Sequence, residues 1–570
     1  MTMMRSSFDS YSLSEKGLKN SPSTQQLVRR TRDDDEASSY DEAVVRVTST
    51  ELTDPEKAAH LRAIRALSIL RTARTPEDPQ AVIDTEFEVR WSEGDLEFPM
   101  NWSLAKRGWI LAVVALQTLI VIFYSTSYVS GARGMMKDFG IKSETTIILG
   151  MTTYLLGLAS GPLLLAPLSE LYGRRIIYLI SLFLFFMLVL PACVAKNFET
   201  ILITRFFAAF AGSVTISNTP GTLGDIFPEE YRTLAFSLYW YFPIPSFGLE
   251  APMNGPVLGP IIGGFVYQNL GWRWNTWLVL ILAGFFAILG ITVPETYAPE
   301  LLRRRAAKLR KETGDERYVS RFCFKNIEGS LLERIKLNMK RPVVMLFTEP
   351  ICIFWAIYVA AIYGILYLCF TAYPIVFTQI RGWGPGLSGL AFLGIGVGTT
   401  LAVAIEPLSR KIYNLHSVDP ETGKRPPEAR ILIIAISAII IPLSLLCFAW
   451  TCVPRHIHWI WPILAGIPYG LGNTIVFLHA NTYLVTSYDV YAASAMAGNA
   501  VVRSILGGVM PLFGPIMYRR LGPNWAATTV ALIAAALIPI PWAFYKWGKK
   551  IRVRSPILQK LQKERTERGE

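Results

Sequence analysis

Long apolar runs alternate with short polar segments from Trp109 to near the end of the chain. An apolar run of about 20 residues forms a helix that can cross the roughly 30 Å hydrocarbon core of a membrane. Twelve runs are long enough, and each is predicted to be a transmembrane helix. They lie near residues 109–130, 146–168, 176–195, 202–222, 236–267, 274–293, 343–366, 386–408, 431–450, 459–483, 492–513 and 526–545. The pattern therefore predicts an all-α membrane protein.

The grouping of these runs predicts two six-helix halves. Six runs precede a long polar segment and six follow it, as a parallel duplication joined by a loop would produce. The tripeptide PLS occurs at 167–169 and again at 407–409, each time at the end of an apolar run and before basic residues and a tyrosine. We expect an N-terminal half at 101–297, a cytosolic central loop at 298–341 and a C-terminal half at 342–547.

The two ends of the chain are polar. Ser, Thr, Asp, Glu and Arg are frequent in residues 1–90 and aromatic residues are few. Such a composition buries too little apolar surface to offset the conformational entropy that is lost on folding. We therefore expect residues 1–100 to be a disordered cytosolic tail and residues 548–570 to be a second cytosolic tail.

The fifth apolar region is longer than one crossing requires, since it runs for about 34 residues from Leu234 to Tyr267. It contains the stretch YFPIPSFGLE, whose prolines argue against one continuous helix. Glu250 would be an isolated charge within the membrane. Two interpretations of residues 241–250 remain open: a genuine insertion, or a gene-model artefact such as a retained intron.

Composition and charge agree with a membrane environment. Hydrophobic residues make up 52% of the chain, charged residues 17%, and the mean hydropathy is +0.35, which fits a soluble core poorly. The net charge of +13 could suggest nucleic-acid binding, but the basic residues cluster in the tails and in loops between apolar runs. This distribution follows the positive-inside rule and predicts cytosolic termini and no nucleic-acid partner.

The sequence lacks motifs for enzymatic chemistry. It contains no GxxxxGK[ST] phosphate loop, no HExxH metal motif and no nucleophile elbow. Its six cysteines show no CxxC spacing, which favours buried free thiols over a metal site. We expect no enzymatic activity, no cofactor and no bound metal.

The stretch PLSELYGRR at 167–175 places a carboxylate, a glycine and two arginines at the polar end of the second run. The glycine permits a tight turn, and the charges can pair with a neighbouring loop or helix end to lock one conformation. The stretch resembles motif A of the major facilitator superfamily, in the form used by fungal twelve-span drug:proton antiporters, although that motif commonly has aspartate at the position of the glutamate. The resemblance implies a conformational latch formed by Glu170, Gly173, Arg174 and Arg175.

The fourth run carries a second resemblance, because ITRFFAAFAGS is similar to motif B of the same family. Its Arg205 is a charge within an apolar run, where it needs a carboxylate, a backbone carbonyl or water as a partner. In the family this arginine is linked to proton transfer, so the resemblance implies that Arg205 couples protons to transport. For Arg503, in the eleventh run, we favour a structural ion pair.

The fifth run carries a third resemblance, because GPVLGPIIGG at 255–264 is similar to motif C, the antiporter signature. Glycines let helices approach closely, while proline removes a backbone donor and bends the helix. A bent, closely packed helix can serve as a hinge between the halves. The residues concerned are Gly255, Gly259, Pro260, Gly263 and Gly264.

With PETYAPELLRRRA after the sixth run and YAASAMAGNAVVRS entering the eleventh, the resemblance covers about residues 95–547. It implies a proton-coupled antiporter that exports drugs, toxins or related small molecules, with the substrate, protons and membrane lipids as its partners. We expect a monomer in the plasma membrane, with the vacuolar membrane as the alternative. Other functions that stay open are export of polyamines or other metabolites, import by proton symport, and a non-transporting membrane receptor.

A substrate cavity is expected near the midplane between the halves, lined by polar and aromatic side chains. Depth within the runs selects nine candidates: Gln117, Tyr124, Asn218, Tyr363, Phe370, Asn473, His479, Asn481 and Asn499. Each has a structural alternative, because polar residues in transmembrane helices also form helix–helix hydrogen bonds. The histidine could also carry protons, since imidazole titrates near neutral pH.

Overall fold

The computed structural model describes residues 87–92, 94–227, 251–320, 331–417, 425–453, 457–488 and 492–559. The chain divides into two compact units, 1–85 and 86–570, and every described residue belongs to the second. Within these ranges the backbone is almost entirely helical, and a parallel bridge pairs Glu88 with Val319. Residues 241–250 and most of the expected N-terminal tail lie outside the described ranges.

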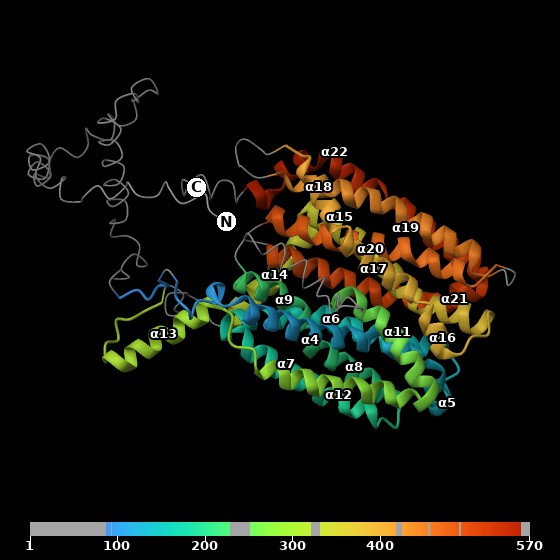
Figure 1. Cartoon of the computed structure of the whole chain (residues 1–570), viewed down its shortest axis with the longest axis horizontal. Helices are drawn as coiled ribbons and strands as arrows, with labels where there is room; N and C mark the ends of the chain where they lie inside the picture. The colour runs from blue at the N-terminus through green and yellow to red at the C-terminus, as the bar shows by residue number, and fades with distance from the viewer. Residues whose placement is uncertain are drawn as a thin grey trace, which may run out of the picture. The chain divides into compact units, whose positions relative to one another are not determined.

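The helices of the N-terminal half follow the order of the apolar runs (Figure 1). They are η1 (Pro99–Asn101), α4 (Leu104–Ser130), α5 (Ala132–Phe139), α6 (Glu144–Tyr172), α7 (Arg174–Cys193), α8 (Phe198–Gly212), α9 (Val214–Ile226), α11 (Ala251–Leu270) and α12 (Trp272–Ile291). The side chains of Ser103, Ser143 and Asn197 each accept a backbone N–H three residues on. These caps satisfy donors that would otherwise be free at the starts of α4, α6 and α8.

The second half follows α13 (Ala298–Thr313), so the expected central loop at 298–341 contains a full helix. Its elements are α14 (Leu331–Thr348), α15 (Pro350–Tyr373), the π-helical continuation η3 (Pro374–Ile380), α16 (Pro385–Leu390), α17 (Leu393–Ala404), α18 (Glu406–Asn414), η4 (Pro427–Arg430), α19 (Ile431–Thr451), α20 (Ile460–Tyr488), α21 (Ala492–Ala536) and α22 (Pro539–Val553).

Ten helical segments in the described ranges are long and apolar enough to cross a membrane. One of them, Ser494–Val553, has 60 residues and includes a break at Gly522, where φ is +75° before Pro523. An unbroken helix of that length would measure about 90 Å against a membrane core of roughly 30 Å, so this segment supplies two crossings. The 20-residue α11 is not among the ten, but it packs inside the bundle against α4. With these two additions, the predicted all-α fold of twelve helices in two six-helix halves is confirmed.

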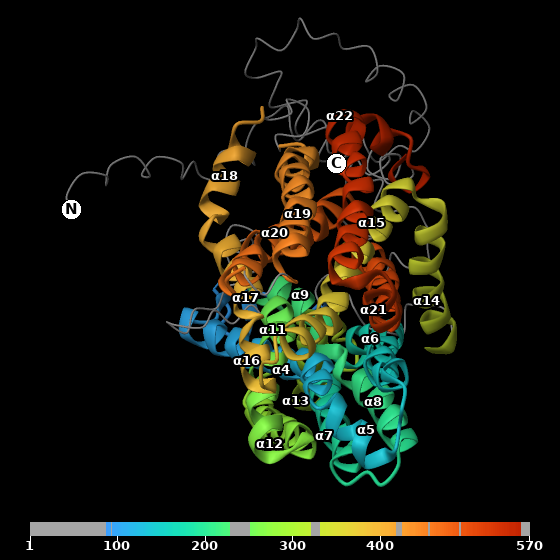
Figure 2. The ribbon, with the colours of Figure 1, turned by 90° about the vertical axis from the view of Figure 1, so that its right-hand side faces the viewer.

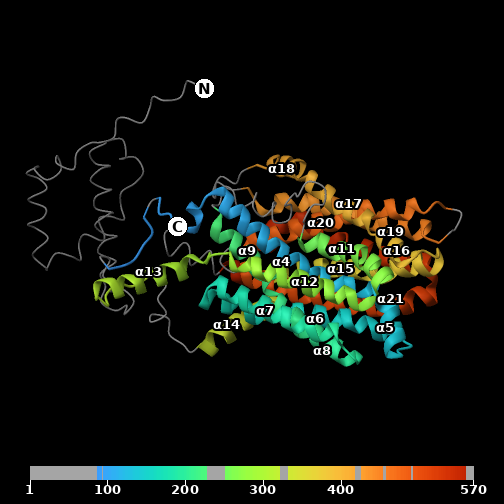
Figure 3. The ribbon, with the colours of Figure 1, turned by 60° about the horizontal axis from the view of Figure 1, so that its bottom comes forward.

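The two halves meet along one long interface. Figure 2 shows the N-terminal half in blue to green below the C-terminal half in yellow to red. Across the interface α6 packs against α21, and α11 packs against α16 and α17. Figure 3 shows α5 and α16 at one end of the bundle and α13 and α14 at the other. These ends are called the α5 end and the α13 end below.

The prediction of a disordered tail through residue 100 is wrong for its described part. Val89 donates its N–H to the Val319 carbonyl oxygen at 3.0 Å, and Asp95 forms an ion pair with Arg305 of α13. The physical reason is local apolar content, because Val89 and Trp91 pack against buried residues of α13. This short segment therefore buries enough surface to become ordered.

The start of the expected C-terminal tail is also ordered. Helix α22 runs to Val553, and the chain then turns back onto Glu349, which lies just before α15 and is fully buried. The Glu349 carboxylate accepts the N–H of Ile557 at 3.0 Å and the hydroxyl of Tyr488 at 3.1 Å. The Ser555 hydroxyl donates to the same carboxylate. A buried acid is thus satisfied by several donors from distant parts of the chain.

Candidate functional site

A tight turn joins α6 to α7 at the α13 end. Gly173 forms it with φ of +89°, a conformation that side chains rarely adopt. The Glu295 carboxylate accepts the backbone N–H groups of Arg174 at 3.0 Å and Arg175 at 3.2 Å. A Cβ at position 173 would lie 2.5 Å from Glu295 Oε2. Glycine thus allows a carboxylate to reach the N-terminus of α7, where the helix dipole favours negative charge.

Arg174 is buried behind this turn. Its Nε lies 2.5 Å from Asp225 Oδ2 at the end of α9, and its guanidinium lies 5.2 Å from the centre of the Tyr297 ring. Burial, assisted by a nearby carboxylate, raises the pKa of the Tyr297 phenol to about 12, so the ring stays neutral. A Cβ at Gly221 would lie 2.5 Å from Arg174 Nη2, so a side chain there would displace the guanidinium. The arginine thereby connects α7, α9 and the segment that follows α12.

The other two motif A residues lie outside this buried pair. Glu170 is exposed and forms no hydrogen bond or ion pair with the part of the chain that the structure describes. Arg175 is partly exposed and donates from Nη2 to the Ile291 carbonyl oxygen at 3.1 Å. Sequence reasoning missed Asp225 and Glu295, the two acids that hold the turn. The available signals were a charge near the end of the fourth run and the acid of PETYAPELL, which served only as a family marker.

Arg174→Ala is expected to destabilise the protein far more than Arg175→Ala. Removing one partner of a buried ion pair leaves the other charge uncompensated, which costs about 3–5 kcal/mol. Thermal unfolding of the purified variants in detergent measures the difference, and Asp225→Asn should add little to Arg174→Ala. Equal unfolding temperatures for the two arginine variants would contradict the assignment.

Arg205 of α8 is fully buried inside the N-terminal half. It donates from Nε to the Gly150 carbonyl oxygen at 2.7 Å and from Nη2 to the carbonyl oxygens of Tyr124 at 3.2 Å and Ser125 at 3.3 Å. No ion pair joins it to a carboxylate among the described residues. The sequence left three kinds of partner open for Arg205: a carboxylate, a backbone carbonyl or water. In the structure its partners are backbone carbonyls.

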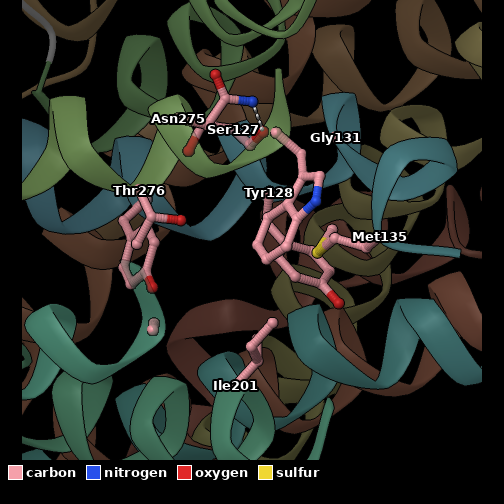
Figure 4. Close-up of a pocket in the computed structure, with 10 residues that line it drawn as sticks. Ser127, Tyr128, Gly131, Met135, Ile201, Asn275 and Thr276 are labelled. Carbon is pink, nitrogen blue, oxygen red and sulfur yellow. Dashed lines mark hydrogen bonds between the residues drawn. The ribbon is translucent and has the colours of Figure 1, made fainter. Parts of the chain in front are cut away.

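Three tyrosine rings surround the guanidinium of Arg205, with ring centres 4.5 Å away for Tyr124, 4.2 Å for Tyr128 and 4.8 Å for Tyr154. A cavity of about 10 Å³ lies beside two of these rings (Figure 4). Within it, Asn275 donates from Nδ2 to the Ser127 carbonyl oxygen at 3.3 Å. Such a volume suits about one water molecule and is too small for a transported solute.

Ser125 connects the Arg205 site to the C-terminal half. Its carbonyl oxygen accepts from Arg205, and its hydroxyl lies 3.0 Å from the Tyr367 hydroxyl of α15. The Tyr363 hydroxyl donates to that of Tyr367 at 3.3 Å, and the Arg503 guanidinium of α21 lies 5.0 Å from the centre of the Tyr363 ring. A continuous set of contacts therefore links one buried arginine in each half.

The nine predicted substrate-lining residues are all buried, and none of the three cavities found in the described ranges is lined by more than one of them. Tyr363, Asn481 and Asn499 lie on the neighbouring helices α15, α20 and α21, and Asn499 donates from Nδ2 to Asn481 Oδ1 at 3.2 Å. Gln117 donates to the Phe286 carbonyl oxygen of α12 at 3.1 Å, which keeps it inside the N-terminal half.

The remaining candidates are spread through the bundle. Phe370 stacks on Phe392 with ring centres 5.1 Å apart. His479 Nε2 lies 3.8 Å from Glu406 Oε2, next to the second PLS copy. Tyr124 belongs to the Arg205 site, and the other two are buried at Asn218 in α9 and Asn473 in α20.

The motif C glycines allow α11 to approach both halves at backbone distance. An added Cβ at Gly259 would lie 2.1 Å from Thr126 Oγ1 of α4, and one at Gly264 would lie 2.5 Å from the Pro385 carbonyl oxygen of α16. The relation is reciprocal, since a Cβ at Gly389 of α16 would lie 2.2 Å from the carbonyl oxygen of Pro260. The close packing of α11 between α4 and α16 therefore depends on glycines in both α11 and α16.

Polar contacts between the halves close the α5 end. Arg519 Nη2 lies 2.6 Å from Glu144 Oε1, and Gly386 donates its N–H to Gln268 Oε1 at 3.0 Å. A cavity of about 110 Å³ lies between the halves there, and none of the nine predicted residues lines it. Sites for drug-sized ligands typically measure roughly 300–1,000 Å³. This cavity is therefore too small for such a ligand in the conformation described.

Two packed halves, long apolar helices and glycine-lined helix contacts are the features of a multi-pass membrane protein. A family model described as Major Facilitator Superfamily matches residues 113–511. The chain is 42% identical over 481 residues to the major facilitator superfamily multidrug transporter mdrA of Aspergillus fumigatus, covering 84% of this chain and 76% of that protein. It is 41% identical over 467 residues to the MFS-type efflux pump MFS2 of Trichophyton rubrum, covering 82% and 76%.

A crystal structure of a D-xylose–proton symporter matches the fold with a TM-score of 0.55, covering 77% of this chain and 98% of that one at 15% identity. At this identity the match concerns the fold alone. The chain belongs to the major facilitator superfamily, as the resemblance of its motifs predicted. It is therefore a membrane transporter, in agreement with the expectation that it is not an enzyme.

Proposed function

We propose that this protein exports drugs, toxins or related small molecules from the cytosol in exchange for protons. The observation that carries the proposal is identity of 41–42% with a multidrug transporter and an efflux pump over more than four fifths of the chain. The position of the motif C helix supports it, because α11 forms close backbone contacts within its own half and across the interface. The plasma membrane is the proposed location, and the single chain is the proposed working unit.

Transport in this proposal alternates between two arrangements of the halves. The contacts between Glu144 and Arg519 hold the α5 end closed, while the latch of Arg174 with Asp225 lies at the α13 end. Basic residues of α13 and α22 support a cytosolic α13 end under the positive-inside rule. The conformation described then corresponds to a state closed toward the outside.

Arg205 has a defined role in the proposed proton coupling. Its guanidinium is held by backbone carbonyl oxygens of α4 and α6, so in this proposal it acts as a positive charge beside the proton path. Its contact with Ser125, and the hydroxyl contact of Ser125 with Tyr367, give this charge a connection to the other half. Movement of the halves would change that connection.

Cells that lack their own drug pumps provide the test. Expression of the protein is expected to lower the steady-state accumulation of the fluorescent cation rhodamine 6G several-fold, and a protonophore is expected to abolish the effect. Accumulation that is unchanged across a panel of toxic compounds would contradict export. Export that persists after the proton gradient has collapsed would contradict proton coupling.

A further inference from the structure

Arg503 of α21 is a buried cation that no anionic group among the described residues contacts. Its side chain is 8% exposed, and its Nε is buried with no hydrogen-bond partner. Within the described part of the chain no hydrogen bond or ion pair reaches any atom of this guanidinium, so the structural ion pair that we favoured from the sequence is not found there. A charge at membrane depth without a carboxylate or a set of carbonyls around it marks a functional site.

Two aromatic rings hold this guanidinium in place. Its carbon atom lies 5.0 Å from the centre of the Tyr363 ring of α15 and 4.7 Å from that of Phe477 of α20. A Cβ at Gly507, one turn further along α21, would lie 2.9 Å from the Tyr363 ring, so this glycine makes room for it. The rings attract the cation, but neither residue accepts a hydrogen bond from its N–H groups.

Arg205 is a matched comparison within the same chain. That guanidinium also lies among tyrosine rings, but it donates to three backbone carbonyl oxygens. Arg503 has the rings and lacks the acceptors. The difference shows that Arg503 has hydrogen-bonding capacity that the described residues do not use.

The polar surroundings of Arg503 extend along the same helix face. Asn499 lies four residues earlier, and residues four apart on a helix are neighbours. Asn499 donates to Asn481 of α20, while its own Oδ1 is buried without a partner. The junction of α15, α20 and α21 therefore presents an unused donor, an unused acceptor and two rings. Tyr363 and Phe477 lie near the middle of α15 and α20, whereas Asn481 and Asn499 lie about two turns from an end of their helices.

The geometry points to a binding site for the acidic group of an aromatic acid at Arg503. The carboxylate would accept from the guanidinium in the two-point geometry that arginine favours, and the aromatic frame would lie against Tyr363 and Phe477. The unpaired Asn499 Oδ1 would accept from a hydroxyl of the same compound. This inference rests on the proposed export function, because it names a class of exported substrate.

Binding of a ligand at Arg503 would change contacts that reach the N-terminal half. Tyr363, which touches Arg503, donates to Tyr367, and Tyr367 contacts the Ser125 hydroxyl of α4. An acid bound at Arg503 would therefore alter the same contacts that reach Arg205. This gives a physical connection between substrate and the proposed proton site.

The test compares 2-naphthoate with 2-naphthamide, which share a ring system and differ in charge. Binding of both to the full-length protein in nanodiscs is measured for the wild type, Arg503→Gln, Arg503→Lys and, as an exposed arginine control, Arg520→Gln. We expect the wild type to prefer the naphthoate at least tenfold. Arg503→Gln should lose that preference, Arg503→Lys should keep part of it, and Arg520→Gln should keep all of it.

Each outcome decides the inference. A preference that survives Arg503→Gln, or that falls equally in Arg520→Gln, would overturn it, and so would a wild type that binds both compounds equally. The lysine variant guards against misfolding, because it retains the charge in a chain of nearly the same shape. Rhodamine 6G export, measured in parallel, separates the two proposals: export without naphthoate preference removes only the acid site, and naphthoate preference without export of any compound removes only the transport function.

Discussion

Arg205→Ala is expected to abolish export, and Arg205→Lys is expected to lower the initial export rate at least tenfold. The planar guanidinium donates to carbonyl oxygens of two helices at once, those of Gly150 in α6 and of Tyr124 and Ser125 in α4. A lysine ammonium is a compact point charge on a flexible stem and cannot reproduce this fixed set of donors. Alanine in addition leaves a large cavity among three rings, which destabilises the half by a few kcal/mol.

The measurement is the initial rate of substrate export in membrane vesicles, normalised to the amount of folded transporter found by size-exclusion chromatography. Arg520→Ala is the matched control, because this arginine is exposed. The lysine variant keeps the positive charge and changes the arrangement of hydrogen-bond donors, so it tests the geometry of the guanidinium apart from its charge. An Arg205→Lys protein that exports at the wild-type rate would show that the guanidinium geometry is not part of the mechanism.

Gly389→Ala is expected to reduce export at least tenfold by keeping the α5 end from closing. The added Cβ would lie 2.2 Å from the Pro260 carbonyl oxygen, whereas ordinary contacts lie at about 3.5–4.0 Å. Because a backbone carbonyl cannot rotate away as a side chain does, α11 and α16 would have to separate by more than 1 Å, roughly the difference between these distances. The contact between Gln268 and the backbone of Gly386 would be lost with them.

Two measurements test this effect on the gate. Export falls, and a cysteine placed at Ser130, which lines the cavity between the halves, should react faster with a membrane-impermeant thiol reagent added from outside. Gly108→Ala is the control, since a Cβ there meets no atom within 4 Å. Gly389→Ala protein with unchanged export and unchanged labelling would rule out this contact as a gate.

The sequence predicted the membrane fold because hydrophobic length alone decides which segments can cross a bilayer. It also identified Arg205 and Arg174, since a charge in or beside an apolar run is conspicuous. The predicted gap between the runs 492–513 and 526–545 agrees with the break at Gly522 within α21. The ordered segment near Trp91 was not predicted, because the residues it packs against belong to α13, about 200 residues further along the chain.

The partners of the charged residues could not be predicted for a similar reason. Asp225 and Glu295 lie 51 and 121 residues from Arg174, and no local periodicity connects such positions. The depth of Tyr363, Asn481 and Asn499 was readable; the structure pairs the two asparagines by a hydrogen bond and places Tyr363 on the neighbouring helix α15. The same depth rule also selected Gln117, which faces α12, because depth does not specify which side of a helix meets the other half.

Transport by purified protein in liposomes tests the central claim most directly. With the vesicle interior made acidic, the account predicts that rhodamine 6G accumulates faster than in protein-free liposomes, and that adding it raises the internal pH reported by a trapped dye as protons leave. Collapse of the gradient with a protonophore should abolish both signals. Accumulation that ignores the gradient, or protons that move in the same direction as the substrate, would contradict the account.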